Sequence, residues 1–166
     1  MSDIDIRTTG RAGRITLNRP KALNALTWDM CLEIEKALKA WADDPVVKLL
    51  IIDGLPCEKA FCAGGDLAEM DAAGENQEAH LLEMATLLHA GVIRFSKMDA
   101  PLIVAVNGTA GGGGFSLVLA GDYVISSDKA KFISAYTASA LTPDGSSTYF
   151  LAKHVGLLRA KELQMT

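Results

Sequence analysis

This sequence of 166 residues lacks regularly spaced cysteines, clusters of lysine and arginine, and long apolar runs. Cysteine occurs three times, at Cys31, Cys57 and Cys62, and an odd number at irregular spacing favours free thiols in a reducing compartment over a disulfide framework. The cysteines also lack the paired spacing and histidine partners of a zinc site, so we predict no metal. All three are expected to be small buried side chains.

The absence of a lysine/arginine cluster, with a net charge of −4 and a pI of about 5.3, argues against nucleic acid as a partner. No apolar run reaches the roughly 18 residues that a membrane span needs, so we expect no membrane partner. The polar start MSDIDIRTTG lacks the basic and apolar regions of a signal peptide. With 49% apolar and 22% charged residues, the chain is predicted to be one globular domain over residues 1–166, located in the cytoplasm.

Strand-like and helix-like segments alternate along the chain. Residues 5–18 have the pattern of two short strands joined by a glycine-containing turn. Thr27 is a candidate N-cap for a helix that ends at residues 43–45, and a second, longer helix is expected over residues 78–96. The apolar positions that recur at helical spacing in the first helix are Met30, Ile34, Leu38 and Trp41.

A β-branched run follows each of these helices. VVKLLIID (residues 46–53) and LIVAV (residues 102–106) are typical of strands buried on both faces. DYVIS (residues 122–126) and KFI (residues 131–133) predict two further strands. Strands that alternate with helices predict an α/β fold with a parallel-rich sheet, whose functional sites lie at the carboxyl ends of the strands.

Two glycine turns occupy that position. KAFCAGGDL (residues 59–67) follows the first buried strand, and NGTAGGGGFSL (residues 107–117), with five glycines, follows the second. Glycine permits positive φ and close approach of a ligand, and two helix-start N–H groups that converge on one carbonyl oxygen form an oxyanion hole. A P-loop is excluded because Phe115 and Ser116, rather than lysine, follow Gly114, and no G-x-G-x-x-G is present. A purely structural glycine turn stays open as the alternative.

Four blocks of sequence resemble the crotonase superfamily, the enoyl-CoA hydratase/isomerase family. They are NRPKALNAL (18–26), KAFCAGGDL (59–67), PLIVAVNGTAGGGGFSL (101–117) and AKFISAY with LTPDGSSTYFLAKHVGLLRAKEL (130–136 and 141–163). They occur in the family's order and cover nearly the whole chain. The resemblance implies a crotonase-like fold of stacked ββα units, with the family's C-terminal helical part missing after Thr166. It also implies a homo-trimer or hexamer.

The resemblance further implies an acyl-CoA thioester as substrate, with coenzyme A as part of that substrate and no other cofactor. By this resemblance, the backbone N–H groups of Gly65 and Gly113 hold the thioester oxygen. The positions that match the family's CoA contacts are Lys21, Ala22, Leu23, Ala63, Asp66 and Leu67. Lys21 taken alone is also explained as a solvated lysine, and Asp66 as a helix cap.

The acid–base groups decide the reaction. Hydratases of the family use two glutamates, and the matching positions in the substrate pocket are Ser116 and Tyr136. Neither side chain suits a general base near neutral pH, so hydration is disfavoured. Asp144, in LTPDGSST, is the candidate base of an isomerase that shifts an enoyl-CoA double bond through an enolate. The alternative is that Asp144 merely caps the helix that follows.

A second resemblance is local, to 4-chlorobenzoyl-CoA dehalogenase. It implies hydrolysis of an aryl-CoA with Asp144 as nucleophile and His89 as general base. Leu88 and Gly65 stand where that enzyme has aromatic residues, and a histidine in an apolar helix is more commonly a core or interface residue. A third alternative is an acyl-CoA binder without turnover. His80 and His154 belong to no motif and are expected at the surface.

Overall fold

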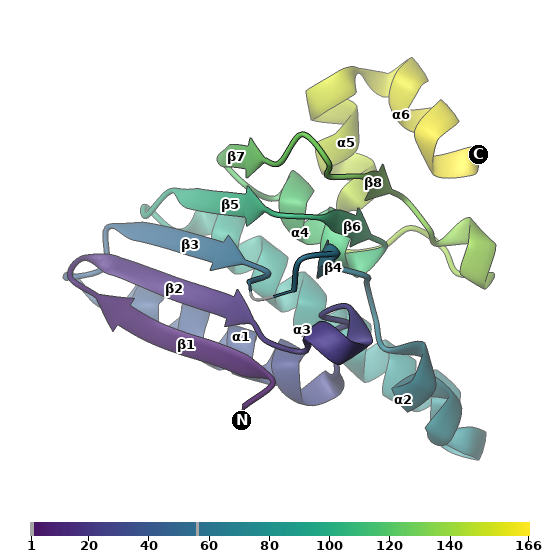
Figure 1. Cartoon of the computed structure of the whole chain (residues 1–166), viewed down its shortest axis with the longest axis horizontal. Helices are drawn as coiled ribbons and strands as arrows, with labels where there is room; N and C mark the ends of the chain where they lie inside the picture. Colours follow the sequence, from purple (N-terminus) through teal and green to yellow (C-terminus); the bar gives the residue numbers. More distant parts are fainter. Residues whose placement is uncertain (1, 56) are drawn as a thin grey trace.

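Five strands form the larger of two sheets in the computed structural model, which describes residues 2–55 and 57–166 (Figure 1). The order is β1-β2-β3-β5-β7; β1 pairs with β2 antiparallel, and the other neighbours are parallel. The predicted α/β architecture with a parallel-rich sheet is therefore confirmed. The strands are β1 (Ile4–Thr9), β2 (Ala12–Leu17), β3 (Leu49–Asp53), β5 (Leu102–Val106) and β7 (Tyr123–Ser126).

A smaller, parallel sheet lies beyond the carboxyl ends of β3 and β5 (Figure 1). It contains β4 (Ala60–Cys62), β6 (Thr109–Gly111) and β8 (Phe132–Ile133), in the order β4-β6-β8. The sequence patterns predict β8 but treat residues 60–62 and 109–111 as parts of turns. These two segments are three-residue strands, so both glycine turns begin at the ends of paired strands.

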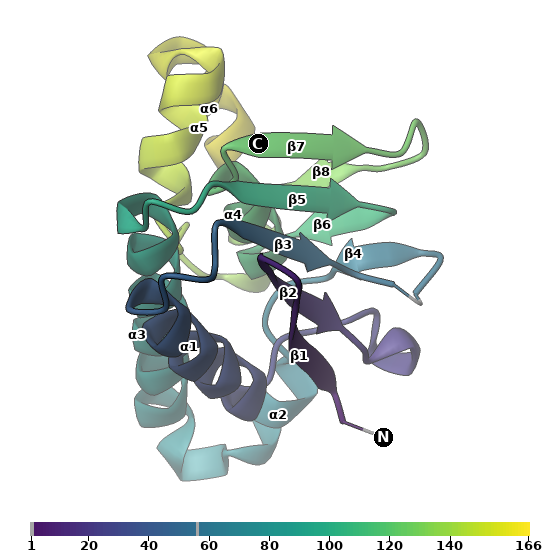
Figure 2. The ribbon, with the colours of Figure 1, turned by 90° about the vertical axis from the view of Figure 1, so that its left-hand side faces the viewer.

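Two long helices, α1 (Trp28–Ala42) and α3 (Gln77–Lys97), cover one face of the larger sheet (Figure 2). As predicted, Thr27 caps α1: its side chain accepts the Met30 N–H at 3.2 Å. The other helices are α2 (Leu67–Ala72), α4 (Gly113–Leu119), α5 (Ser147–Val155), α6 (Leu157–Met165) and the 3-10 turns η1 (Pro20–Ala22), η2 (Gly74–Asn76) and η3 (Thr137–Ser139). Across the described ranges, no helix is long and apolar enough to cross a bilayer.

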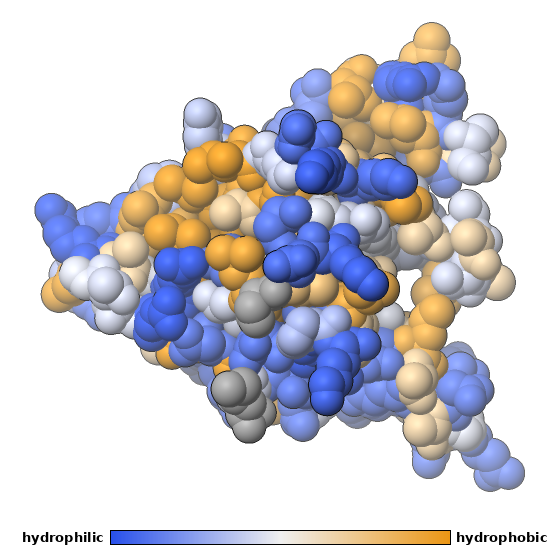
Figure 3. All heavy atoms as spheres, in the orientation of Figure 1, coloured by the Kyte–Doolittle hydropathy of each residue, from blue (hydrophilic) through white to orange (hydrophobic). Residues whose placement is uncertain are grey.

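The main core lies between the larger sheet and these two helices. Strand residues alternate in burial, so Leu50, Ile52 and Val104 are at most 1% exposed, whereas Ile51 and Ile103 on the opposite face are only half-buried. The expectation that β3 and β5 are buried on both faces is therefore wrong. Helices cover one face, and apolar side chains remain visible over β3, β5 and β7 in Figure 3. The three cysteines are free and buried, as predicted.

Candidate active site

The two glycine turns lie side by side because β4 and β6 are parallel neighbours, with Cys62 paired to Ala110. Gly64, at a φ of +107°, packs directly against the second turn. A Cβ at that position would lie 3.0 Å from the Gly111 carbonyl oxygen and 3.4 Å from the Gly113 nitrogen. Such contact is tighter than real side chains normally make, so glycine brings the two turns together.

In each turn, the backbone N–H that the sequence predicts as an oxyanion donor is unpaired among the residues that the structure describes. Within the described ranges, no hydrogen bond joins the N–H of Gly65 or Gly113 to another group, whereas the Gly112 N–H bonds to the Ile133 carbonyl at 3.1 Å. Gly113 is the first residue of α4, where the N–H groups have no partner inside the helix. Both glycines line the same cavity, so the structure brings together the two residues that the sequence predicts as oxyanion donors.

That cavity has a volume of about 90 Å³ and a mostly apolar wall. Among the described residues that line it, Asp144 is the single carboxylate, and Tyr136 also reaches it. Cys31 is on the wall as well, and burial, reinforced by the nearby Cys62, raises the pKa of its thiol to about 12. The wall includes the apolar residues Leu26, Met70, Leu81, Met84, Leu88 and Leu141.

Asp144 is held by two hydroxyl groups. The Tyr136 hydroxyl donates to Asp144 Oδ1 at 2.7 Å, and Ser116 Oγ lies 2.6 Å from Tyr136 Oη and 3.1 Å from the Asp144 carbonyl oxygen. Burial, and then the Asp144 carboxylate, raise the pKa of Tyr136 well above its ordinary value, so its hydroxyl remains a donor. Ser116 is fully buried behind the cavity wall, while Tyr136 forms part of that wall.

The three histidines occupy different environments. His89 Nε2 accepts the Gly145 N–H at 2.8 Å, next to Asp144 in the chain. His154 is exposed, as predicted, with Nε2 3.0 Å from the Leu119 carbonyl oxygen. His80 is half-buried, with its side chain 22% exposed and Nε2 3.7 Å from Glu69 Oε1, so it lies only partly at the surface.

The predicted CoA-binding segments also lie together. The Ala63 N–H donates to the Leu23 carbonyl at 3.0 Å, and the Leu26 N–H donates to the Gly64 carbonyl at 2.7 Å. Lys21 and Leu23, in and after η1, are exposed, Ala22 is half-buried, and Leu67 is 57% exposed at the start of α2. Their contact with CoA stays a prediction.

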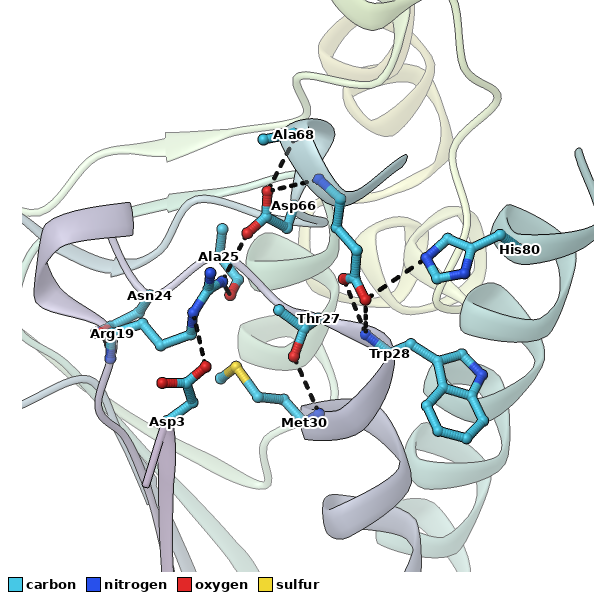
Figure 4. Close-up of polar contacts among 11 residues, drawn as sticks. Asp3, Arg19, Asn24, Ala25, Thr27, Trp28, Met30, Asp66, Ala68 and His80 are labelled. Carbon is cyan, nitrogen blue, oxygen red and sulfur yellow. Dashed lines mark hydrogen bonds and ion pairs between the residues drawn. The ribbon is translucent and has the colours of Figure 1, made fainter. Parts of the chain in front are cut away.

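Asp66 organises the turn that carries Gly65 (Figure 4). Its Oδ1 accepts the Ala68 and Glu69 N–H groups at 3.0 and 3.2 Å, which confirms the helix-cap interpretation. Its Oδ2 lies 2.8 Å from Arg19 Nη1. Burial would raise the pKa of Asp66, but the hydrogen bonds from Arg19 and from α2 outweigh it and keep that pKa below its ordinary value.

The family model described as enoyl-CoA hydratase/isomerase matches residues 8–166. The chain belongs to this family. Its parallel-rich α/β fold agrees with the solved enoyl-CoA hydratase structures that it matches, with TM-scores of 0.87 and 0.91.

Three relatives within or near the enoyl-CoA hydratase/isomerase family show the range of reactions. The chain is 38% identical over 95% of its length to a mitochondrial 3-hydroxyisobutyryl-CoA hydrolase of Danio rerio and 32% identical over 92% to a trans-2-decenoyl-[acyl-carrier-protein] isomerase of Streptococcus mutans. Over 98% of its length, the chain matches the crystal structure of an enoyl-CoA hydratase from Bacillus anthracis, with a TM-score of 0.88 and 31% identity. The chain spans only 41%, 57% and 62% of these three proteins.

Some residues that shape this site have little signal in the sequence. Asn24 is completely buried and donates to the carbonyls of Gly54 and Phe61 at 2.7 and 3.0 Å, which fixes the segment before α1. Glu69 accepts the Trp28 N–H at 3.1 Å and so joins α2 to the start of α1. An asparagine in NRPKALNAL is the one hint, because asparagine tolerates the positive φ of 56° found there.

Proposed function

We propose that this chain carries the site of an acyl-CoA isomerase, which shifts the double bond of an enoyl-CoA through an enolate with Asp144 as the base. One observation carries the proposal: among the described residues, Asp144 is the single carboxylate on the cavity that Gly65 and Gly113 also line. Coenzyme A would enter as part of the substrate, with no further cofactor. A cytoplasmic homo-trimer or hexamer is part of the same proposal.

The proposed reaction needs two kinds of group. The N–H groups of Gly65 and Gly113 would donate to the thioester oxygen and stabilise the negative charge that collects there when a proton leaves the acyl chain. Oδ1 of Asp144 accepts from Tyr136, which leaves Oδ2 to take that proton. Returning it to the other end of the dienolate moves the double bond, and no atom is gained or lost.

Hydration requires an additional group that activates water. The positions that match the two hydratase glutamates hold Ser116 and Tyr136, and both hydroxyls are used in holding Asp144. The raised pKa of Tyr136 makes it unsuited to deprotonate water near neutral pH. These side chains favour isomerisation over hydration, although relatives with either name match the chain.

Hydrolysis of a CoA thioester is a second candidate, because the Danio rerio relative named as a hydrolase matches 95% of the chain at 38% identity. The same donors would stabilise the tetrahedral oxyanion, and Asp144 would act on the attacking water or on the carbonyl carbon. This candidate predicts release of free CoA thiol, which isomerisation does not produce.

The test is incubation of the protein with a 3-enoyl-CoA, followed by the absorbance of the conjugated 2-enoyl thioester. We expect product with the unchanged protein and loss of roughly 100-fold or more in rate with Asp144→Asn, because the amide cannot take up the proton. Asp128→Asn, which removes an exposed carboxylate, is the matched control and should leave the rate unchanged.

Other products would overturn the proposal. Thiol release without a conjugated product indicates the hydrolase, and halide release from an aryl-CoA indicates the dehalogenase chemistry. Tight binding of the CoA ester with no product of any kind indicates a binder. A conjugated product that forms equally fast with Asp144→Asn would show that another group is the base.

A further inference from the structure

The backbone after Asp144 adopts an unfavourable conformation. Gly145 and Ser146 have positive φ angles of 56° and 59°. A Cβ on Gly145 would lie 2.5 Å from the Ser116 Cβ, so this turn is pressed against α4. A residue such as serine is strained at positive φ, and contacts around it must offset that strain. The turn that presents Asp144 is therefore held in place by its neighbours.

His89 provides one of these contacts, across 56 residues of sequence. Its Nε2 lies 2.8 Å from the Gly145 nitrogen, and a backbone N–H can only donate. Nε2 therefore carries the lone pair, and the proton of the neutral imidazole is on Nδ1. A ring nitrogen that already accepts this bond is not available to take a proton from substrate or water.

We propose that His89 is a positioning residue: by accepting the Gly145 N–H it fixes the turn that places the Asp144 carboxylate at the cavity. The inference rests on the proposed role of Asp144. His89 holds this turn from α3, while Ser116 of α4 and Tyr136 hold Asp144 itself. Two helices distant in sequence, together with the nearby Tyr136, thus fix one carboxylate, and His89 does not act as the base.

Two substitutions separate this role from that of a base. His89→Gln keeps a side-chain oxygen that can accept the Gly145 N–H but cannot act as a base, whereas His89→Ala removes the acceptor. We expect His89→Ala to lower kcat for 3-enoyl-CoA by roughly 10- to 100-fold, because a small misplacement of a reacting group has effects of that size. KM should stay within about twofold, and His89→Gln should restore kcat to within about threefold.

A general base gives a different pattern, since its loss lowers the rate by about 10²- to 10⁴-fold whichever residue replaces it. Equal collapse of kcat in His89→Gln and His89→Ala would overturn the proposal. Unfolding midpoints of both variants show whether the fold is intact, and His154→Gln, at a histidine that also contacts a backbone group, is the matched control.

A spectroscopic readout does not depend on turnover. Nitrogen NMR of labelled histidine, assigned by comparison with His89→Gln, should show His89 protonated on Nδ1 and unprotonated on Nε2. A proton on Nε2 at neutral pH would overturn the proposal. If no isomerase activity is found but the spectrum agrees, the proposed reaction fails and the His89 contact still stands.

Discussion

Replacing Tyr136 by phenylalanine tests how Asp144 is held. The substitution removes the hydroxyl that donates to Asp144 Oδ1 at 2.7 Å and keeps the ring that lines the cavity. Ser116 Oγ keeps a partner, because it lies 3.1 Å from the Asp144 carbonyl oxygen. The change therefore deletes one hydrogen bond to a carboxylate without leaving a second buried hydroxyl unsatisfied.

The magnitude follows from the kind of bond. A hydrogen bond to a charged group is worth about 1.5–3 kcal/mol, and a tenfold change in rate corresponds to about 1.4 kcal/mol. If the bond is needed to orient the base, Tyr136→Phe should lower kcat by roughly 10- to 100-fold. Because the same bond also stabilises the fold, we expect the free energy of unfolding to fall by about 1.5–3 kcal/mol.

The assays are the conjugated-product assay with 3-enoyl-CoA and urea unfolding. Tyr123→Phe is the matched control, since Tyr123 is exposed on β7 and its loss of a hydroxyl should change neither quantity. A kcat for Tyr136→Phe within twofold of the unchanged protein, with unaltered stability, would refute the argument that this hydroxyl orients Asp144.

Three further predictions concern stability, measured by urea unfolding. Gly64→Ala should cost about 1–3 kcal/mol because its Cβ at a φ of +107° would lie 3.0 Å from the Gly111 carbonyl oxygen, and Gly10→Ala, with nothing within 4 Å, should cost less. Because the pKa of Asp66 is lowered in the folded protein, its carboxylate adds stability at neutral pH. That stability is lost as the pH falls below the ordinary pKa of aspartate and through the lowered pKa of Asp66. Asp66→Asn should weaken this loss of stability at acid pH, and an unchanged acid dependence would contradict the assignment. Thr27→Ala should cost about 1 kcal/mol and Thr27→Ser much less, and equal losses would argue against the cap.

Local features of the fold were predictable from the sequence, and features that depend on distant contacts were not. The start of α1 follows from a threonine three residues before Met30, because the cap is a local hydrogen bond. In contrast, β4 and β6 have three residues each and exist because they pair with one another, about 50 residues apart. β3 is buried on a single face because the helices pack on that side of the sheet. A β-branched run of sequence does not indicate where helices pack.

The same distinction applies to the site. The glycine turns predicted two N–H donors at neighbouring strand ends, and the structure places both on one cavity. The contact of Gly145 with His89 joins α3 to the loop before α5, and the contact of Asp144 with Tyr136 lies within the segment between β8 and α5. Neither contact has a sequence pattern. For that reason the sequence left His89 open as a base, a core residue or an interface residue.

The central claim, that Asp144 removes a proton from an acyl-CoA held by Gly65 and Gly113, is tested most directly by exchange of the α-protons of a saturated acyl-CoA in deuterated water. Such a substrate has no double bond to move, so the measurement detects enolate formation alone. Mass spectrometry should show deuterium entering the acyl chain with the unchanged protein and not with Asp144→Asn. Equal exchange in both proteins, or none in either, would contradict the account.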